Sequence, residues 1–101
     1  MNIHVIEQLN NFVKLPDDKW ESGGWSIDES KAEKLIGGEI YFHKKRTEPS
    51  FFGGSIIDCR VDQSPECQGK VVFTFQYDGN CRNVNTDKYG WSKKIKIISN
   101  E

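Results

Sequence analysis

The chain lacks the long hydrophobic run that a membrane-spanning helix needs. Its apolar stretches are only a few residues long, against the roughly 20 residues that span a bilayer, so we expect neither a membrane helix nor a membrane partner. The first ten residues lack the basic start and the continuous apolar stretch of a secretory signal, and Asn-x-Ser/Thr sequons are absent. These absences predict a cytoplasmic location.

Cysteine is scarce, and its spacing is not that of a metal-binding or redox motif. Cys59, Cys67 and Cys81 are an odd set without a CxxC pair, which favours reduced thiols over a disulfide framework. A zinc site built from these three residues and His43 is the alternative, but it would lack the closely paired ligands of structural zinc motifs. We therefore predict no metal site and no cofactor.

Catalytic motifs are absent too. The chain has no GxSxG, GxxxxGK[ST], HExxH or dinucleotide-binding fingerprint, and nothing in the spacing places a nucleophile beside His4 or His43. A Cys59–His43 pair on neighbouring strands is conceivable, but strand alternation turns Cys59 toward the core and His43 away from it. A thiol buried in apolar surroundings also reacts poorly. The sequence therefore predicts a protein that is not an enzyme.

Neither sign of charge is in excess, since 14 Lys and Arg stand against 15 Asp and Glu. This balance argues against wholesale phosphate binding, because nonspecific affinity grows with the number of cationic contacts. Charge is locally concentrated in two basic clusters, Lys44-Lys45-Arg46 and Lys93-Lys94 with Lys96. Each cluster alone is typical of a solvated strand end.

What the chain does contain is enough aromatic surface for one folded domain. Its 101 residues include Trp 3, Tyr 3 and Phe 6, more burial potential than disordered chains have, and the length fits a single domain over residues 1–101. No internal repeat or low-complexity segment is visible.

The first half of the chain shows helical spacing twice. Apolar residues at three- and four-residue steps predict a helix over residues 3–13, although β-branched Ile3, Val5 and Ile6 favour a strand at 3–6 followed by a turn as the alternative. Residues 17–24 are expected to form a loop. A second helix is predicted over residues 29–36, with Asp28 as N-cap, Ala32, Leu35 and Ile36 facing the core, and Gly37-Gly38 at its end.

The second half shows the alternation of half-buried strands. Strands are predicted over residues 39–45, 54–61, 70–77 and 93–98. In the first strand Ile40 and Phe42 are predicted to face the core, with Tyr41 and His43 on the opposite face. In the other three strands, taken in order, the predicted core-facing residues are Ile57, Cys59 and Val61; Val71, Phe73, Phe75 and Tyr77; and Ile95 and Ile97. We expect an α+β, mostly β fold, either a small barrel or a curled, mostly antiparallel sheet, with one or two short helices.

Two aromatic segments could form a binding site. In Ser50-Phe51-Phe52-Gly53-Gly54, the glycines either open a cleft for a flat heteroaromatic ligand or let the sheet bend while the phenylalanines plug its end. Trp91, which precedes the second basic cluster, suits base stacking. Trp25 shares its Gly-Trp-Ser setting, and either tryptophan could instead be a core residue.

The order of these elements resembles the PUA-like superfamily, especially its EVE and ASCH branches. The resemblance runs over about residues 20–98 and includes a helix ending in Gly-Gly, a strand EIYFHKK, and the link SFFGG into the strand SIIDCRV. Gly38-Glu39 stands where many relatives have Gly-Asp. The resemblance implies a small pseudobarrel that binds nucleic acid, often at a modified or flipped base, with pocket residues Trp25, His43, Ser50, Phe51 and Gly53.

We therefore predict a non-catalytic module for nucleic acid or a nucleotide-like, possibly modified-base, ligand. Trp25 and Phe51 would stack on the ligand, His43 and Ser50 would contact its polar edges, and Trp91 is added as a stacking residue outside the resemblance. Lys44, Lys45 and Arg46 would contact phosphates. The alternative is a small regulatory domain that docks on a larger protein partner through exposed aromatic residues.

Overall fold

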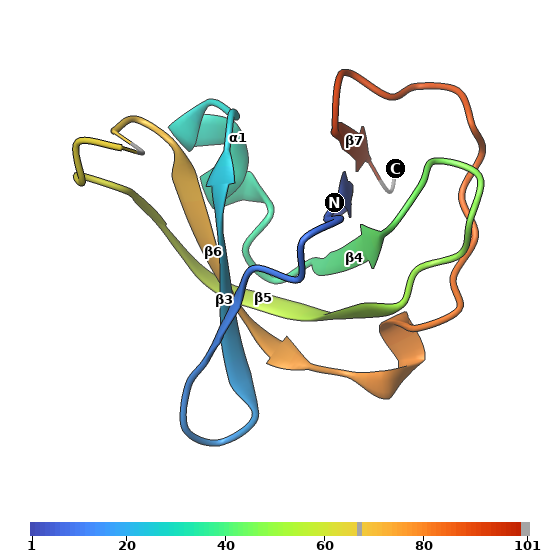
Figure 1. Cartoon of the computed structure of the whole chain (residues 1–101), viewed down its shortest axis with the longest axis horizontal. Coiled ribbons are helices and arrows are strands. Elements are labelled where there is room, and N and C mark those ends of the chain that lie inside the picture. The colour runs from blue at the N-terminus through green and yellow to red at the C-terminus, as the bar shows by residue number, and fades with distance from the viewer. Residues whose placement is uncertain (67, 100–101) are drawn as a thin grey trace.

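The chain folds around a single curled sheet. A computed structural model describes residues 1–66 and 68–99, and in that part the chain has seven strands, one α-helix and one 3-10 turn (Figure 1). The elements are β1 (Asn2–Ile6), β2 (Phe12–Lys14), β3 (Lys19–Trp25), α1 (Glu29–Lys34), β4 (Glu39–His43), β5 (Phe52–Val61), β6 (Val71–Tyr77), η1 (Gly79–Cys81) and β7 (Ile95–Ile98). No helix among the described residues has the length and apolar character needed to cross a bilayer.

The strands follow the order β2-β3-β6-β5-β4-β1-β7. Adjacent strands are antiparallel except for β1 and β4, which run parallel. The sheet curls strongly (Figure 1), yet its described strands do not close into a barrel, so β2 and β7 are its outermost strands. The α+β, mostly β prediction is confirmed in the form of a curled sheet, with seven strands instead of the four expected.

The predicted helix over residues 3–13 is wrong, and its alternative, a strand at 3–6, corresponds to β1. This strand lies between β4 and β7 in the sheet. Four of its five residues are buried because both of its faces are covered, so its apolar pattern does not alternate. The apolar residues that continued the helical spacing, such as Phe12, belong to the next strand. The predicted loop over residues 17–24 is also wrong, because β3 pairs with both β2 and β6 there.

Helix α1 lies where the sequence predicts it but is shorter. Asp28 occupies the N-cap position without a side-chain cap hydrogen bond. Ala32 and Leu35 are fully buried, whereas Ile36 is 42% exposed because the helix has already ended. Gly37 ends the turn at a φ of 93°, a left-handed conformation that glycine adopts without strain. The amide of Gly37 then donates to the Ile56 carbonyl (2.9 Å), which fixes the helix end to β5.

The four predicted strands are confirmed with shifted ends, but the side-chain prediction for β5 is partly wrong. Ile56 is buried and Ile57 is 41% exposed, the reverse of the expected arrangement. The pairing register with β6 shifts between Ile56 and Asp58. Such a bulge inserts one extra residue, so the side chains after it point to the opposite face from the one that strict alternation would give. Ile56 before the bulge and Cys59 after it therefore both pack in or against the core.

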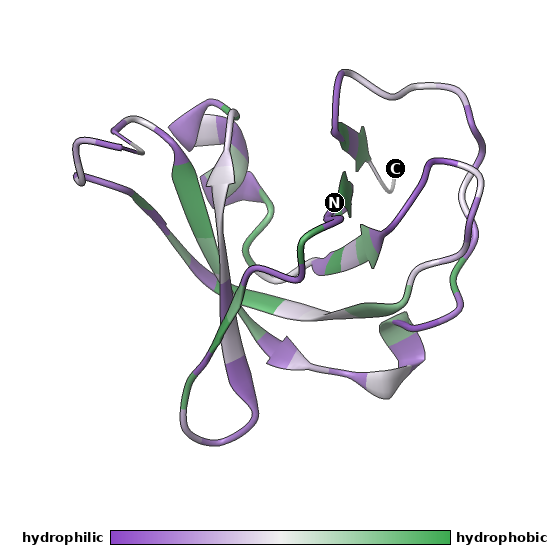
Figure 2. Cartoon of the chain, in the orientation of Figure 1, coloured by the Kyte–Doolittle hydropathy of each residue, from purple (hydrophilic) through white to green (hydrophobic). Residues whose placement is uncertain are grey.

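The core occupies the concave face of the sheet, and the hydrophobic residues concentrate on the strands (Figure 2). Its largest fully buried side chains include Phe42, Phe73 and Phe75. The outer face of β4 is buried as well, because η1 and the segment after it lie against it: Tyr41 is 9% exposed and His43 is fully buried. The half-buried strand predicted there is therefore buried on both faces.

A cleft at the open seam of the sheet

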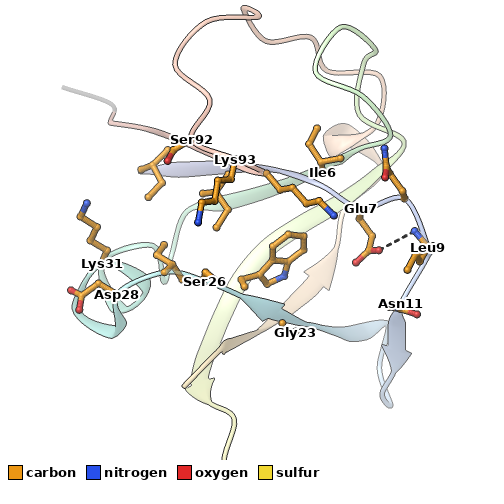
Figure 3. Close-up of a pocket in the computed structure, with 17 residues that line it drawn as sticks. Ile6, Glu7, Leu9, Asn11, Gly23, Ser26, Asp28, Lys31, Ser92 and Lys93 are labelled. Atoms are coloured by element: carbon orange, nitrogen blue, oxygen red, sulfur yellow. Dashed lines mark hydrogen bonds between the residues drawn. The ribbon is translucent and has the colours of Figure 1, made fainter. Parts of the chain in front are cut away.

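A cleft of about 770 Å³ lies where the curled sheet fails to close. Three segments line it: residues 6–9 and 11 after β1, residues 23–28 and 31 from the end of β3 into α1, and residues 92–95 and 97 at β7. Figure 3 shows side chains from these segments around one space, with Glu7 and Leu9 on one side and Asp28 and Lys31 on the other. We call this space the seam cleft.

Trp25 and the two glycines before it form one wall of the seam cleft. Strand β2 pairs with β3 only up to Ser22, and the register with β6 shifts between Ser22 and Trp25. Gly24 has a φ of 82°, and a Cβ placed on it would meet no atom within 4 Å. Trp25 is 6% exposed, and its Nε1 donates to the Ser22 hydroxyl (2.9 Å), which fixes the indole in place.

Cations outnumber acids around the seam cleft. Lys31, Lys93 and Lys94 line it against two carboxylates, Glu7 and Asp28. Glu7 is 7% exposed and accepts a hydrogen bond from the Leu9 amide (3.2 Å), shown as a dashed line in Figure 3. The lining therefore combines one largely buried tryptophan with a small excess of positive charge.

The two basic clusters touch through one residue, although the first cluster does not line the seam cleft. Arg46 donates to the carbonyl of Lys93 (2.6 Å), so residues far apart in the sequence share one face. Lys70 adds a further cation by donating to the hydroxyl of Ser26, which lines the cleft. Lys96 differs, because it is 9% exposed and its Nζ donates to the Asp87 carbonyl (2.6 Å).

His43 and Trp91 lie together, but in packed structure and not along the seam cleft. His43 Nε2 is 2.8 Å from Nδ1 of His4, and its ring meets Trp91 edge-on at 5.9 Å between centroids. The guanidinium group of Arg46 lies over the Trp91 ring, 5.9 Å from its centroid. This cluster holds the segment before β7 against β4.

The hydrogen bonds of the two histidines fix their protons. Nδ1 of His43 lies 2.8 Å from the Glu48 carbonyl, which can only accept, so this nitrogen carries the proton. Nε2 of His43 must then accept from Nδ1–H of His4. Burial, followed by the charges of His43 and Lys96, lowers the pKa of His4 to about 4, and burial also lowers the pKa of His43. Both rings are thus neutral at neutral pH.

Ser50 and Gly53, two more predicted ligand contacts, have packing roles. The Ser50 hydroxyl donates to the Cys81 carbonyl (2.6 Å) and accepts from the Val84 amide (2.9 Å). A Cβ on Gly53 would overlap the Ile40 carbonyl oxygen and lie 2.8 Å from Cβ of Cys81. The glycine is required by the close approach of another backbone, and a ligand has no room beside it.

Phe51 and the first basic cluster do not line the seam cleft. Phe51 lines a second, smaller pocket and lies under Lys44, whose Nζ is 4.5 Å from the ring centroid. Lys45 forms an exposed ion pair with Glu48 (3.8 Å). The six predicted pocket residues therefore do not converge: Trp25 lines the seam cleft, Phe51 lines the second pocket, and the others are packed.

The thiols of the described residues are not activated. Cys59 and Cys81 are both free, and burial raises the pKa of each, that of Cys81 to about 12 with a further contribution from Glu39. Cys81 donates to a Glu39 carboxylate oxygen (3.1 Å). These two residues and Asp78 form the one group of possible metal ligands found among the described residues. The zinc set of the sequence analysis differs from this group, and its Cys67 lies outside the described residues.

Of the residues that line the seam cleft, the sequence predicts only Trp25 as a ligand contact, and it shows Lys93 and Lys94 only as part of a basic cluster. Lys31 looks like an ordinary residue of a solvated helix face, and Glu7 and Leu9 fell inside a helix that does not form. The pairing of Gly23-Gly24 with an adjacent tryptophan was the one local pattern that pointed to this place.

Comparisons with known proteins identify no relative of this chain: no protein-family model, curated protein or solved structure matches it.

Proposed function

We propose that this chain is a non-catalytic module that binds a nucleotide-like ligand, or one nucleotide of a single-stranded nucleic acid, in the seam cleft. The observation that carries the proposal is the meeting of Trp25 with Lys31, Lys93 and Lys94 on one cavity. A base has a flat face that stacks on an aromatic wall, and its phosphate is attracted by ammonium groups at the margin. The proposal places stacking at Trp25 and moves the phosphate contacts from Lys45 and Arg46 to these lysines.

The size and charge of the cleft support this ligand class. Its volume of about 770 Å³ falls within the roughly 300–1,000 Å³ of small-molecule sites. The near-neutral net charge of the chain suits a ligand with few phosphates better than a long duplex, because duplex binding needs many cationic contacts. The PUA-like relationship and the cytoplasmic location stay predictions, and this proposal does not depend on them.

Titration of labelled single-stranded oligonucleotides at several salt concentrations tests the proposal. We expect the parent protein to bind at low salt, and the triple variant Lys31→Gln, Lys93→Gln, Lys94→Gln to reduce the slope of log affinity against log salt by about 2 units, since each contact to a single strand contributes about 0.7. Lys34→Gln is the matched control, because Lys34 is exposed on the same helix but does not line the cleft. If the parent binds neither mononucleotides nor oligonucleotides at low salt, the proposal is wrong.

A protein partner is the second candidate, and exposed aliphatic residues favour it. Leu9 is 76% exposed where it lines the cleft, and Val13 is 56% exposed on the outermost strand β2. Such residues could anchor a partner's side chains. Binding to an apolar interface would change little with salt, whereas phosphate contacts weaken steeply as salt rises, so the same titration separates the two candidates.

A further inference from the structure

A second pocket, rich in aromatic residues, lies outside the seam cleft. Its volume is about 320 Å³, and its lining residues are Asp18, Trp20, Phe51, Phe52, Tyr77 and Arg82. The rings come from three strands and the segment before β5, and they support one another: Trp20 meets Phe52 edge-on at 5.3 Å and Tyr77 stacks on Phe52 at 5.2 Å between centroids. The walls of this pocket are therefore held in place without a ligand.

Positive charge gathers at the mouth of this aromatic pocket. Nζ of Lys14 lies 5.6 Å from the Trp20 ring centroid, Nζ of Lys44 lies 4.5 Å from that of Phe51, and Arg82 is a lining residue. Asp18 is the one acid in the lining. Aromatic faces that already carry the chain's own cations do not need a cationic ligand. The combination fits a flat ring attached to an anionic group.

Lys44 connects the two pockets. Its Nζ donates to Asn10 Oδ1 (2.6 Å) and to the Gln8 carbonyl (3.4 Å). Gln8 lines the seam cleft, and Phe51, under the same ammonium group, lines the aromatic pocket. Lys44 lines neither pocket, but it contacts one lining residue of each.

We propose that the aromatic pocket takes a second base of the same single strand, and that Lys44 contacts the phosphate between the two bases. The inference rests on the proposed function of the seam cleft and makes the ligand an oligonucleotide, in place of a free mononucleotide. A strand bound in this way has one base on the Trp25 side, one on the Phe51 side, and its backbone passing Lys44. Extended single-strand sites combine stacking rings with cations along the backbone in this manner.

A length series of single-stranded oligodeoxythymidylates, from one to six nucleotides, tests the inference on the intact chain. We expect a step in affinity of about 5- to 150-fold at the length that reaches both pockets, which is the equivalent of one stacking contact. Lys44→Gln should lower the salt slope by about 0.7 units for oligonucleotides beyond the step, and leave mononucleotide binding unchanged. Lys45→Gln is the matched control, since Lys45 is exposed and paired with Glu48.

The outcomes separate this inference from the proposed function. If mononucleotides bind and affinity does not rise with length, the second subsite is absent while the seam cleft stands. If Lys44→Gln weakens mononucleotides and oligonucleotides equally, Lys44 does not lie between two bases and the inference is wrong. Arg82→Gln provides a second check, because it should reduce only the affinity gained at the step. If no probe binds at low salt, both proposals fail together.

Discussion

Two Gly-Gly pairs in this chain have opposite surroundings. At Gly53 and Gly54 an added Cβ would overlap a carbonyl oxygen of the neighbouring strand, that of Ile40 or Gln76. At Gly24 the same addition would meet no atom within 4 Å, and both Gly23 and Gly24 line the seam cleft. The first pair allows two backbones to pack closely. In the second pair only Gly24 leaves space, since a Cβ on Gly23 would lie 3.0 Å from a methyl group of Val72.

The difference shows what a glycine pair does and does not reveal. Glycine in a strand marks a position where a side chain would be in the way, but the occupant of that space can be a neighbouring backbone or a ligand. Around Gly53 the occupant is the protein itself, as the Ser50–Cys81 contact also shows. Substitutions should therefore act differently in the packed region and in the open one.

Gly54→Val is expected to have the largest effect. Its Cβ would overlap the Gln76 carbonyl oxygen, and because backbone cannot move aside as a flexible side chain does, we expect a loss of about 3 kcal/mol or more in the free energy of unfolding. Urea denaturation measures this loss. Ser55→Val, at the next position of β5, is the control and should cost much less. A Gly54→Val protein as stable as the parent would contradict the close approach of β5 and β6.

Acid should destabilise the packed region through the His4–His43 pair. Because burial lowers the pKa of His4 from 6.5 to about 4, the unfolded chain binds more protons between these values. Stability is therefore complete above pH 6.5 and should fall by about 2–3 kcal/mol as pH drops to about 4. Urea denaturation at pH 7, 6, 5 and 4 measures the loss.

His4→Phe is the variant that assigns this acid sensitivity. Its ring can retain the stacking on Tyr41, which lies 4.6 Å from His4 between centroids, but it cannot take a proton. The variant should lose less stability between pH 7 and pH 4 than the parent. An equal loss in both proteins would assign the effect to His43, whose pKa is also lowered by burial, or to carboxylates.

Ser50→Ala should have an intermediate effect. It removes the donor to the Cys81 carbonyl and the acceptor of the Val84 amide, and buried polar groups left without partners cost about 1–3 kcal/mol. Thermal unfolding measures the loss, and Ser30→Ala on the exposed face of α1 is the control. If ligand affinity fell while stability did not, Ser50 would contact the ligand as the sequence suggested.

Gly24→Ala should have the smallest effect on stability and a selective effect on the ligand. The space is open, so the cost comes from placing alanine at a φ of 82°, about 1 kcal/mol. Gly69→Ala is the matched control, because Gly69 has a φ of 84°, similar open space, and no part in the seam cleft. The two variants should be equally stable, and only Gly24→Ala should weaken oligonucleotide binding. Equal affinities would place the ligand elsewhere.

The sequence predicted the elements whose side-chain pattern follows from two clearly different faces. Helix α1 and strand β6 each have one buried face and one more exposed face, so the spacing of their apolar residues shows the type of element. Strand β1 is buried on both faces, because His4 and Ile6 are buried opposite its core residues. This burial removes the alternation and leaves a spacing that also fits a helix. The polar, glycine-containing β3 resembled a loop because its pairing partners, not its composition, make it a strand.

The candidate site was harder to predict than the fold. Trp25, Lys93 and Lys94 stood out as residue types, but their meeting with Lys31 depends on how far the sheet curls before β7 reaches the end of β3. His43 and Ser50 carry the same functional groups as ligand contacts, and only their partners, the Glu48 and Cys81 carbonyls, show that these groups are already used.

The position of β7 at the edge of the sheet has a consequence for motion. Among the strands of the sheet β7 pairs with β1 alone, so this strand can separate by local unfolding while β3, β5 and β6 keep all their pairings. Regions with few partners open at lower free energy than the core. Because β7 is also a wall of the seam cleft, its backbone amides should exchange with solvent deuterium before those of β6, and a bound ligand that bridges β7 and β3 would slow that exchange.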